Sequence, residues 1–238
     1  MQHTMKNNNT LIIDGHEDIA WNALELGRDV LQSVYAGRAQ ENDSHLGERL
    51  VGFPELLKGR IGLVFATTFV PPASHAKGLD IRVIPQDAQR LHQQQMQYYQ
   101  QLTERTSQTR IVKTWKDVQE VLSSWDSEQP QVGLVMLMEG ADGILEPEDV
   151  GAWYEEGLRI IEAIYTICQI AGSAQHVAIG SDFDGGFGLD SIPPELDSIA
   201  DLYKIGDALS QQGYIQADIE AVLKDNWLRI LKKSLPTA

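Results

Sequence analysis

The chain has 238 residues, which suits one large domain and is close to the ~250 residues of a closed eight-stranded α/β barrel. Its 34 acidic and 19 basic residues give a formal net charge of -15, which argues against a nucleic-acid-binding surface, so we expect no nucleic-acid partner. The single cysteine, Cys168, excludes an intramolecular disulfide.

The sequence predicts neither a signal peptide nor a membrane-spanning helix. Residues 1–10 are polar and rich in asparagine, without the apolar core of a signal peptide. No apolar stretch approaches the ~18 residues that a membrane-spanning helix requires. We therefore expect a cytoplasmic protein without a membrane span.

Apolar strands and amphipathic helices alternate along the chain. Strands are expected at residues 11–13, 60–70, 111–113, 131–138 and 176–180. Helices are expected at residues 21–34, 86–105, 115–125, 199–212 and 215–231, and residues 35–57 are expected to form a long loop. Between Pro147 and Ala171 apolar residues recur every three or four positions, which favours one long helix broken at Gly157. The alternative is a strand fragment at residues 158–161. The alternation predicts a parallel sheet, open or closed.

The first strand leads directly into a candidate metal-binding pair. Successive side chains of a strand point to opposite faces, so His16 and Asp18 are expected to point the same way, as two ligands of one metal must. Imidazole nitrogen and carboxylate oxygen suit zinc or a similar divalent ion. The motif alone leaves a second interpretation open, a hydrogen-bonded pair in a loop.

Two further strands end in acidic residues. Glu139 follows the strand at 131–138, and Asp182 and Asp184 follow the strand at 176–180. The C-terminal ends of parallel strands are where sites assemble in α/β folds, and these groups suit metal binding or proton transfer. Taken singly, Glu139 also suits a helix cap or an ion pair, and Asp182 a hydrogen bond within a loop.

These motifs resemble those of the membrane dipeptidase (renal dipeptidase) family of zinc peptidases, peptidase family M19. The resemblance is carried by residues 14–18, 138–142, 176–186 and 226–231, and it covers most of the chain. It implies a (β/α)8 barrel, two zinc ions, a hydroxide between them that attacks the peptide carbonyl, and dipeptide substrates.

The resemblance also implies a role for each matching residue. His16 and Asp18 match the ligands of the first metal. Glu139 matches the carboxylate that bridges both metals, and Asp182 matches the acid–base aspartate at the leaving amine.

The chain departs from the family in its middle. Family members are longer, and between the Glu-Gly motif and the Ser-Asp-Phe-Asp loop they carry two histidines that bind the second metal. In this chain only residues 141–175 lie there, and none is a histidine. The family's substrate-contacting histidine and arginine belong to the same missing region. The sequence therefore predicts one domain over residues 1–238 with an internal deletion near 160–164, one visible zinc site, and too few strands to close a barrel.

Three functional hypotheses remain open. The first is a metal-dependent dipeptidase with reduced activity, in which a metal-activated water cleaves small dipeptides. The second is a catalytically inactive fragment that binds metal or self-associates, because exposed strand edges favour a homo-oligomer. The third is an amidohydrolase-like barrel acting on lactones or amides, which explains the His16-x-Asp18 pair but not the Ser-Asp-Phe-Asp loop.

Overall fold

The computed structural model describes residues 10–41, 47–70, 85–139, 143–146, 148–162, 177–186 and 188–237. Its strands are β1 (Ile12–Glu17), β2 (Ile61–Thr68), β3 (Thr109–Ile111), β4 (Val132–Glu139) and β5 (Leu158–Glu162). Its helices are α1 (Ile19–Leu26), α2 (Val34–Arg38), α3 (Phe53–Lys58), α4 (Pro85–Arg105), α5 (Trp115–Ser124), α6 (Asp149–Glu156), α7 (Tyr203–Gln211), α8 (Gln216–Glu220) and α9 (Asn226–Ser234). A π-helical turn, Ala221–Asp225, joins α8 to α9.

The strands form one parallel sheet in the order β1-β2-β4-β3, and β5 also pairs with β4. β3 lies beside the first residues of β4 and β5 beside the last, so both occupy the same edge of β4. β2 is buried along its whole length, and β4 is buried up to its last residue. Burial on both faces explains why these two strands are almost continuously apolar.

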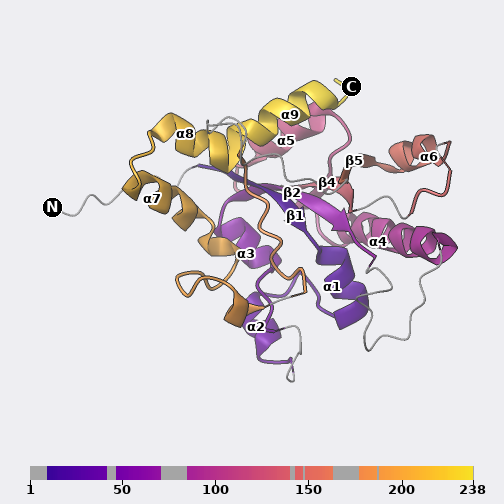
Figure 1. The fold of residues 1–238 in the computed structure, drawn as a ribbon, viewed down its shortest axis with the longest axis horizontal. Helices are drawn as coiled ribbons and strands as arrows, with labels where there is room; N and C mark the ends of the chain where they lie inside the picture. Colours follow the sequence, from indigo (N-terminus) through magenta and orange to yellow (C-terminus); the bar gives the residue numbers. More distant parts are fainter. Residues whose placement is uncertain are drawn as a thin grey trace.

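Helices cover both faces of the sheet (Figure 1). Parallel crossovers are right-handed, so a step in one direction along the sheet places its helix on one face and a step back places it on the other. The chain steps forward from β1 to β2 and from β2 to β3, and then back to β4. α5, which makes the backward step, accordingly lies on the opposite face from α1, α3 and α4.

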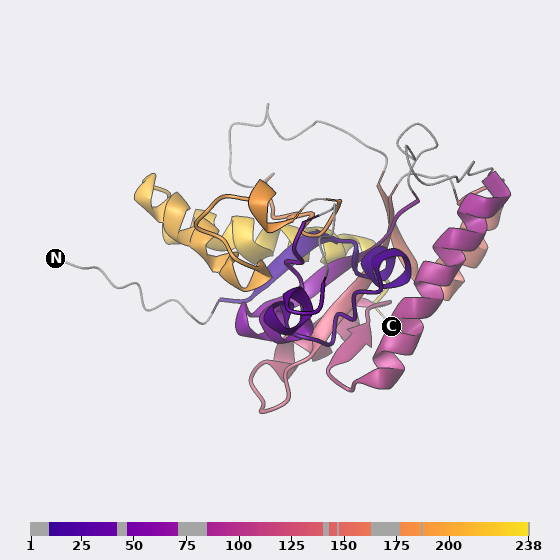
Figure 2. The same ribbon diagram turned by 90° about the horizontal axis from the view of Figure 1, so that it is seen from below.

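Alternate residues of each strand feed two separate cores. Ile12 and Val64 point to the face covered by α1, α3 and α4, whereas Ile13, Leu63 and Phe65 point to the face covered by α5 and α9. Viewed from below, α4 lies at one end of the sheet and α7 and α8 lie towards the other (Figure 2). The predicted parallel α/β architecture is confirmed, and the described residues contain five strands of a sheet rather than a closed ring of eight.

The predicted continuous helix over residues 147–171 is wrong, and the alternative, a strand at residues 158–161, is confirmed as β5. α6 ends at Glu156, Gly157 adopts φ 120°, and the chain then enters β5. Glycine allows this backbone conformation, and Leu158 and Ile160 gain hydrogen-bonded positions opposite Met136 and Leu137 of β4. Periodicity could not distinguish a helix from a short buried strand here, because both bury the same apolar residues. Residues 163–171 lie outside the described part of the chain.

Other predicted boundaries also shift. The expected helix over 21–34 is replaced by α1, which ends at Gly27 in the left-handed conformation, and the expected loop over 35–57 contains most of α2 and all but the last residue of α3. Residues 177–180 form no regular strand, although Gly15 of β1 donates a backbone hydrogen bond to Ile179. Thr114 caps the start of α5, where Thr114 and Asp117 form a complete capping box.

The longest helix, α4, packs against the sheet through one apolar stripe, and its other side chains are mostly polar. Met96, Tyr99 and Leu102 are buried against the sheet. His92 is also buried, with Nδ1 2.8 Å from the Thr68 hydroxyl. No helix in the described ranges is long and apolar enough to cross a membrane.

Gly157 should be required for the turn from α6 into β5. We expect Gly157→Ala to lower the free energy of unfolding by about 1–2 kcal/mol, because alanine is strained at positive φ. Gly151→Ala is the matched control, because Gly151 lies in α6 with no atom within 4 Å of the place a methyl group would take. This variant should raise the free energy of unfolding by about 0.5–1 kcal/mol. Urea unfolding measures both, and equal stability of the two variants would contradict the assigned turn.

Candidate metal centre

The four residues that the sequence singles out meet at the C-terminal end of the sheet. His16 Nε2 lies 3.8 Å from Asp18 Oδ2, 3.5 Å from Glu139 Oε2 and 3.5 Å from Asp182 Oδ1. His16, Asp18 and Asp182 each offer a ligand atom, and these atoms lie within 4.8 Å of one another. The expected proximity is therefore observed, and the roles of the individual residues stay predictions.

The end of β1 brings His16 and Asp18 together by a route that strand alternation does not describe. β1 and β2 lose register between Asp14 and Glu17, which indicates a β-bulge. Asp18 lies beyond the strand, at the N-cap position of α1. The two side chains converge because the chain bulges and then turns into the helix.

Asp182 reaches the cluster from a tight loop after the segment 177–180. Its φ of 54° is left-handed, and its carbonyl accepts a hydrogen bond from Gly185 N at 2.9 Å. A Cβ on residue 185 would lie 2.0 Å from Asp182 Oδ1, so only glycine fits beside this carboxylate. The glycine after Asp184 is thus part of how the loop presents Asp182.

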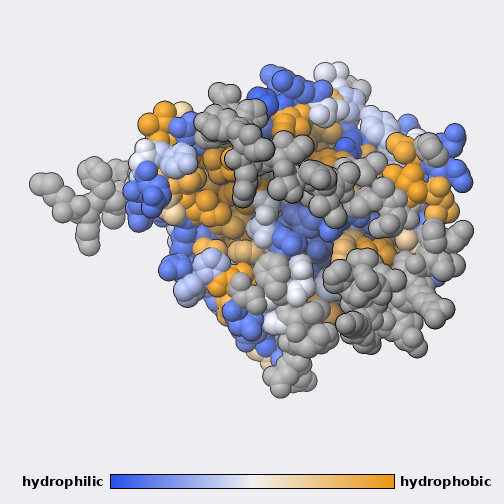
Figure 3. Space-filling model, viewed as in Figure 1, coloured by the Kyte–Doolittle hydropathy of each residue, from blue (hydrophilic) through white to orange (hydrophobic). Residues whose placement is uncertain are grey.

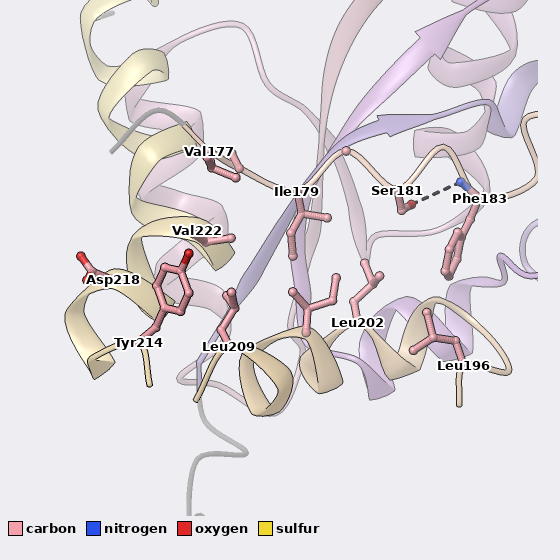
Figure 4. Close-up of a pocket in the computed structure, with 13 residues that line it drawn as sticks. Val177, Ile179, Ser181, Phe183, Leu196, Leu202, Leu209, Tyr214, Asp218 and Val222 are labelled. Atoms are coloured by element: carbon pink, nitrogen blue, oxygen red, sulfur yellow. Dashed lines mark hydrogen bonds between the residues drawn. The ribbon is translucent and has the colours of Figure 1, made fainter. Parts of the chain in front are cut away.

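Asp14 ties this loop to β1, a role that the sequence analysis missed. Its fully buried Oδ1 accepts hydrogen bonds from His16 N at 3.3 Å and from Ser181 N at 2.8 Å. The Ser181 hydroxyl donates to Glu17 Oε1 at 3.2 Å and accepts from Phe183 N at 3.3 Å (Figure 4). The signal available in the sequence was a carboxylate directly after an apolar strand, two residues before the candidate ligand.

Asp184, the other acidic residue of the loop, is turned away from the cluster. Its carboxylate accepts from Leu50 N at 2.7 Å and Val51 N at 3.0 Å, and it lies 3.5 Å from Arg28 Nη1. Burial raises the pKa of Asp184 to about 6, against the lowering effect of Arg28 and the two amides. Asp184 therefore anchors the loop to the segment before α3.

The cluster has the charge pattern of a cation site. Burial raises the pKa of Asp18, and Asp18 Oδ1 is buried without a hydrogen-bond partner among the described residues. Burial alone would lower the pKa of His16, but the neighbouring carboxylates of Asp18, Glu139 and Asp182 raise it to about 11. A divalent cation would compensate these carboxylates, and imidazole plus carboxylates is a donor set that suits zinc.

The described residues provide one such group of ligands. His92, the other described histidine, contacts Thr68 and Trp153 in the core. The four remaining histidines, at positions 3, 45, 75 and 176, lie outside the described residues. The shortage of ligands for a second metal stays a prediction from the sequence.

Two cavities flank the loop that carries Asp182. One, of about 670 Å³, opens at the cluster and includes His16, Glu139 and Asp182 in its lining. The other, of about 930 Å³, separates residues 177–183 from α7, α8 and the π-helical turn, and its lining is largely apolar (Figure 4). The face of the molecule drawn in Figure 3 shows a hydrophilic centre next to an apolar area on the side of α7 and α8. The loop therefore has its polar site on one side and an apolar cavity on the other.

Replacing Asp14, whose carboxylate joins the loop at Ser181 to β1, should weaken metal binding. We expect Asp14→Ala to lower zinc affinity about 10- to 100-fold, because the loop with Asp182 is no longer held against His16. Asp14→Asn keeps an oxygen acceptor and should retain most of the affinity, and Asp207→Ala, an exposed change in α7, should retain all of it. Competition against a chelator measures affinity, and circular dichroism confirms folding. A folded Asp14→Ala variant with unchanged affinity would contradict this role.

Among the proteins that the chain matches are one partial sequence relative and two solved structures of similar fold. The chain is 40% identical over 73 residues to an uncharacterized protein in the pqqA 5′ region of Klebsiella pneumoniae; the match covers 31% of this chain and 25% of that protein. The crystal structure of dipeptidase AC, a metallo peptidase of family M19, matches with a TM-score of 0.69 and 15% identity, covering 96% of this chain and 99% of that one.

The second structure is a metallo peptidase from Rhodobacter sphaeroides bound to a phosphinate mimic of the dipeptide L-Ala-D-Ala. Its TM-score is 0.70 at 14% identity, and the match covers 95% of this chain and 100% of that one. At such identities the structural likeness shows the fold.

The sequence profile described as membrane dipeptidase (peptidase family M19) matches residues 3–165 and 159–236. The two matched stretches contain every residue of the cluster and together span nearly the whole chain. The chain therefore belongs to the membrane dipeptidase family, peptidase family M19.

Proposed function

We propose that this protein is a zinc-dependent hydrolase of small dipeptides that holds one metal ion. The observation that carries the proposal is the convergence of His16, Asp18, Glu139 and Asp182 at the strand ends of a family M19 fold. The dipeptide mimic bound to the Rhodobacter sphaeroides relative supports dipeptides as the substrate class.

His16, Asp18 and Glu139 would hold the metal in this proposal. Zinc, when bound, supplies a water whose pKa is lowered to ~7 and a Lewis acid for the substrate carbonyl. Asp18 is 4% exposed and anchored at the start of α1, so it would be a rigid ligand, whereas the Glu139 carboxylate is 30% exposed and faces the cavity.

Asp182 has a different environment from the other two carboxylates. Its side chain is 49% exposed, at the rim of the cavity and 3.5 Å from His16 Nε2. A group at the rim can exchange protons with solvent and with a leaving amine, so we assign to Asp182 the transfer of a proton to that amine. The same carboxylate also lies close enough to His16 and Asp18 to be a ligand.

One observation favours the alternative, an inactive metal-binding member of the family. The described residues hold one histidine in the cluster, and the stretch 141–175 contains none. A single ion with few ligands binds more weakly than a pair bridged by a carboxylate. The internal deletion near 160–164, self-association and a cytoplasmic location stay predictions from the sequence.

Activity should depend on zinc and on this cluster. Zinc-loaded protein should hydrolyse Ala-Ala or Ala-D-Ala, and His16→Ala should abolish the activity because it removes the central ligand. Asp182→Asn should lower kcat by about 10²- to 10⁴-fold through loss of proton transfer. Asp207→Asn, the same change on the exposed surface of α7, should leave kcat unchanged.

The assay should be paired with a count of bound zinc per chain. One zinc with His16-dependent hydrolysis supports the proposal. One zinc without hydrolysis above the His16→Ala background would establish the inactive alternative instead.

A further inference from the structure

Asn22 of α1 joins the two segments that carry Asp18 and Asp182. The residue is 5% exposed, and its side-chain nitrogen donates twice. Asn22 Nδ2 donates to Asp18 O at 3.0 Å and to Asp184 O at 2.9 Å. The first carbonyl belongs to a candidate metal ligand, and the second lies two residues beyond Asp182. One buried amide therefore sets the distance between the start of α1 and the loop that carries Asp182.

The backbone that Asn22 contacts in this loop is strained. Asp182 and Asp184 have φ of 54° and 67°, in the left-handed region that costs a non-glycine residue about 1–2 kcal/mol. Such conformations persist where surrounding contacts fix them. Asp184 O accepts from Gly186 N at 2.9 Å as well as from Asn22 Nδ2. The amide of Asn22 is therefore one of the contacts that keep the loop in the shape that presents Asp182.

Arg28 fixes the orientation of the Asn22 amide. Arg28 Nη1 donates to Asn22 Oδ1 at 3.1 Å, so the amide oxygen faces the guanidinium and the amide nitrogen faces the two carbonyls. Arg28 is itself buried. Its Nη2 donates to Gly47 O at 2.6 Å, and its Nε lies 3.1 Å from Glu41 Oε1. The amide cannot turn over without losing its bond to an arginine that is held in place.

The loop is held on both sides of Asp182. Before it, Ser181 N donates to Asp14 Oδ1. After it, Asp184 O accepts from Asn22. The first contact reaches the loop from β1 and the second from α1, the elements that position the neighbouring ligands of the cluster. A metal site needs its ligands held to within about 0.5 Å by such supporting contacts.

We propose that Asn22 is a positioning residue of the metal centre, which fixes where the Asp18 and Asp182 carboxylates stand around His16. Its amide is engaged with backbone carbonyls and Arg28, so it acts through these carbonyls and not as a ligand. The ligand atoms of the cluster lie within 4.8 Å of one another, and a shift of either carboxylate changes the coordination of a bound ion. The inference rests on the proposed function for the presence of a metal at the cluster, and its test measures coordination rather than turnover.

The test replaces the Asn22 amide with a carboxylate of the same shape. Asn22→Asp keeps an oxygen facing Arg28 but turns a second oxygen towards two carbonyls that repel it. The added negative charge alone would strengthen cation binding, so weaker binding separates positioning from electrostatics. We expect zinc affinity, measured by competition against a chelator, to fall about 10- to 100-fold. Cobalt(II) bound in place of zinc should show a changed visible spectrum, because its absorption depends on the number and arrangement of the ligands.

Gln131→Glu is the matched control. Gln131 lies directly before β4, at the opposite end of the sheet from the cluster. Its amide has the same kinds of partner, since Nε2 donates to Ser107 O at 2.7 Å and Oε1 accepts from Arg110 Nε at 3.2 Å. This variant should change neither the zinc affinity nor the cobalt spectrum. Asn22→Leu, which removes the hydrogen bonds without adding a charge, repeats the test if circular dichroism shows that Asn22→Asp does not fold.

The outcomes distinguish this inference from the proposed function. A folded Asn22 variant with unchanged zinc affinity, or with weaker binding but an unchanged cobalt spectrum, overturns the inference even if the enzyme hydrolyses dipeptides. Weaker binding with a changed spectrum, in a protein that hydrolyses no dipeptide, supports the inference and overturns the proposed activity. Failure of the unaltered protein to bind zinc or cobalt overturns both.

Discussion

The candidate site depends on the Asp14 carboxylate, which joins two parts of the chain that no regular strand pairing connects. Its Oδ1 accepts from the backbone of His16 on β1 and from the backbone of Ser181 in the distant loop. Hydrogen bonds to a buried carboxylate are strong, and losing one leaves a buried polar group unsatisfied. Because residues 177–180 form no strand, this carboxylate and the Gly15–Ile179 backbone bond set where Asp182 stands relative to His16.

The sheet provides the other fixed positions by different means. β4 is locked by β2 on one edge and by β3 and β5 on the other, so Glu139 leaves the sheet at a defined point. The bulge in β1 and the turn into α1 set His16 and Asp18. The site is thus assembled from two strand ends, one helix start and one loop, and most of the apolar lining of its cavity comes from the sheet and α9.

Much of the fold follows from local pattern. The apolar runs at 60–70 and 131–138 predict β2 and β4 because a strand buried on both faces needs apolar side chains throughout. The cap of α5 at Thr114 and the apolar stripe of α4 also depend on residues close in the sequence. Local pattern offers β5 only as an alternative, because residues 158–162 continue the helical spacing of α6. Whether they form a strand depends on the free edge of β4, which is distant in the sequence.

The sequence by itself determined the family, the parallel α/β class and the four residues of the candidate site, because motif identity and apolar periodicity are carried by residue types at short spacings. Only the tertiary structure showed what the neighbouring carboxylates contact. Asp182 and Asp184 stand two residues apart, yet one joins His16 and the other binds the backbone of Leu50 and Val51. Asp14 likewise joins the loop to β1 only because the fold places Ser181 N beside its carboxylate. Each of these roles is set by a partner more than 100 positions away, and no local pattern contains that information.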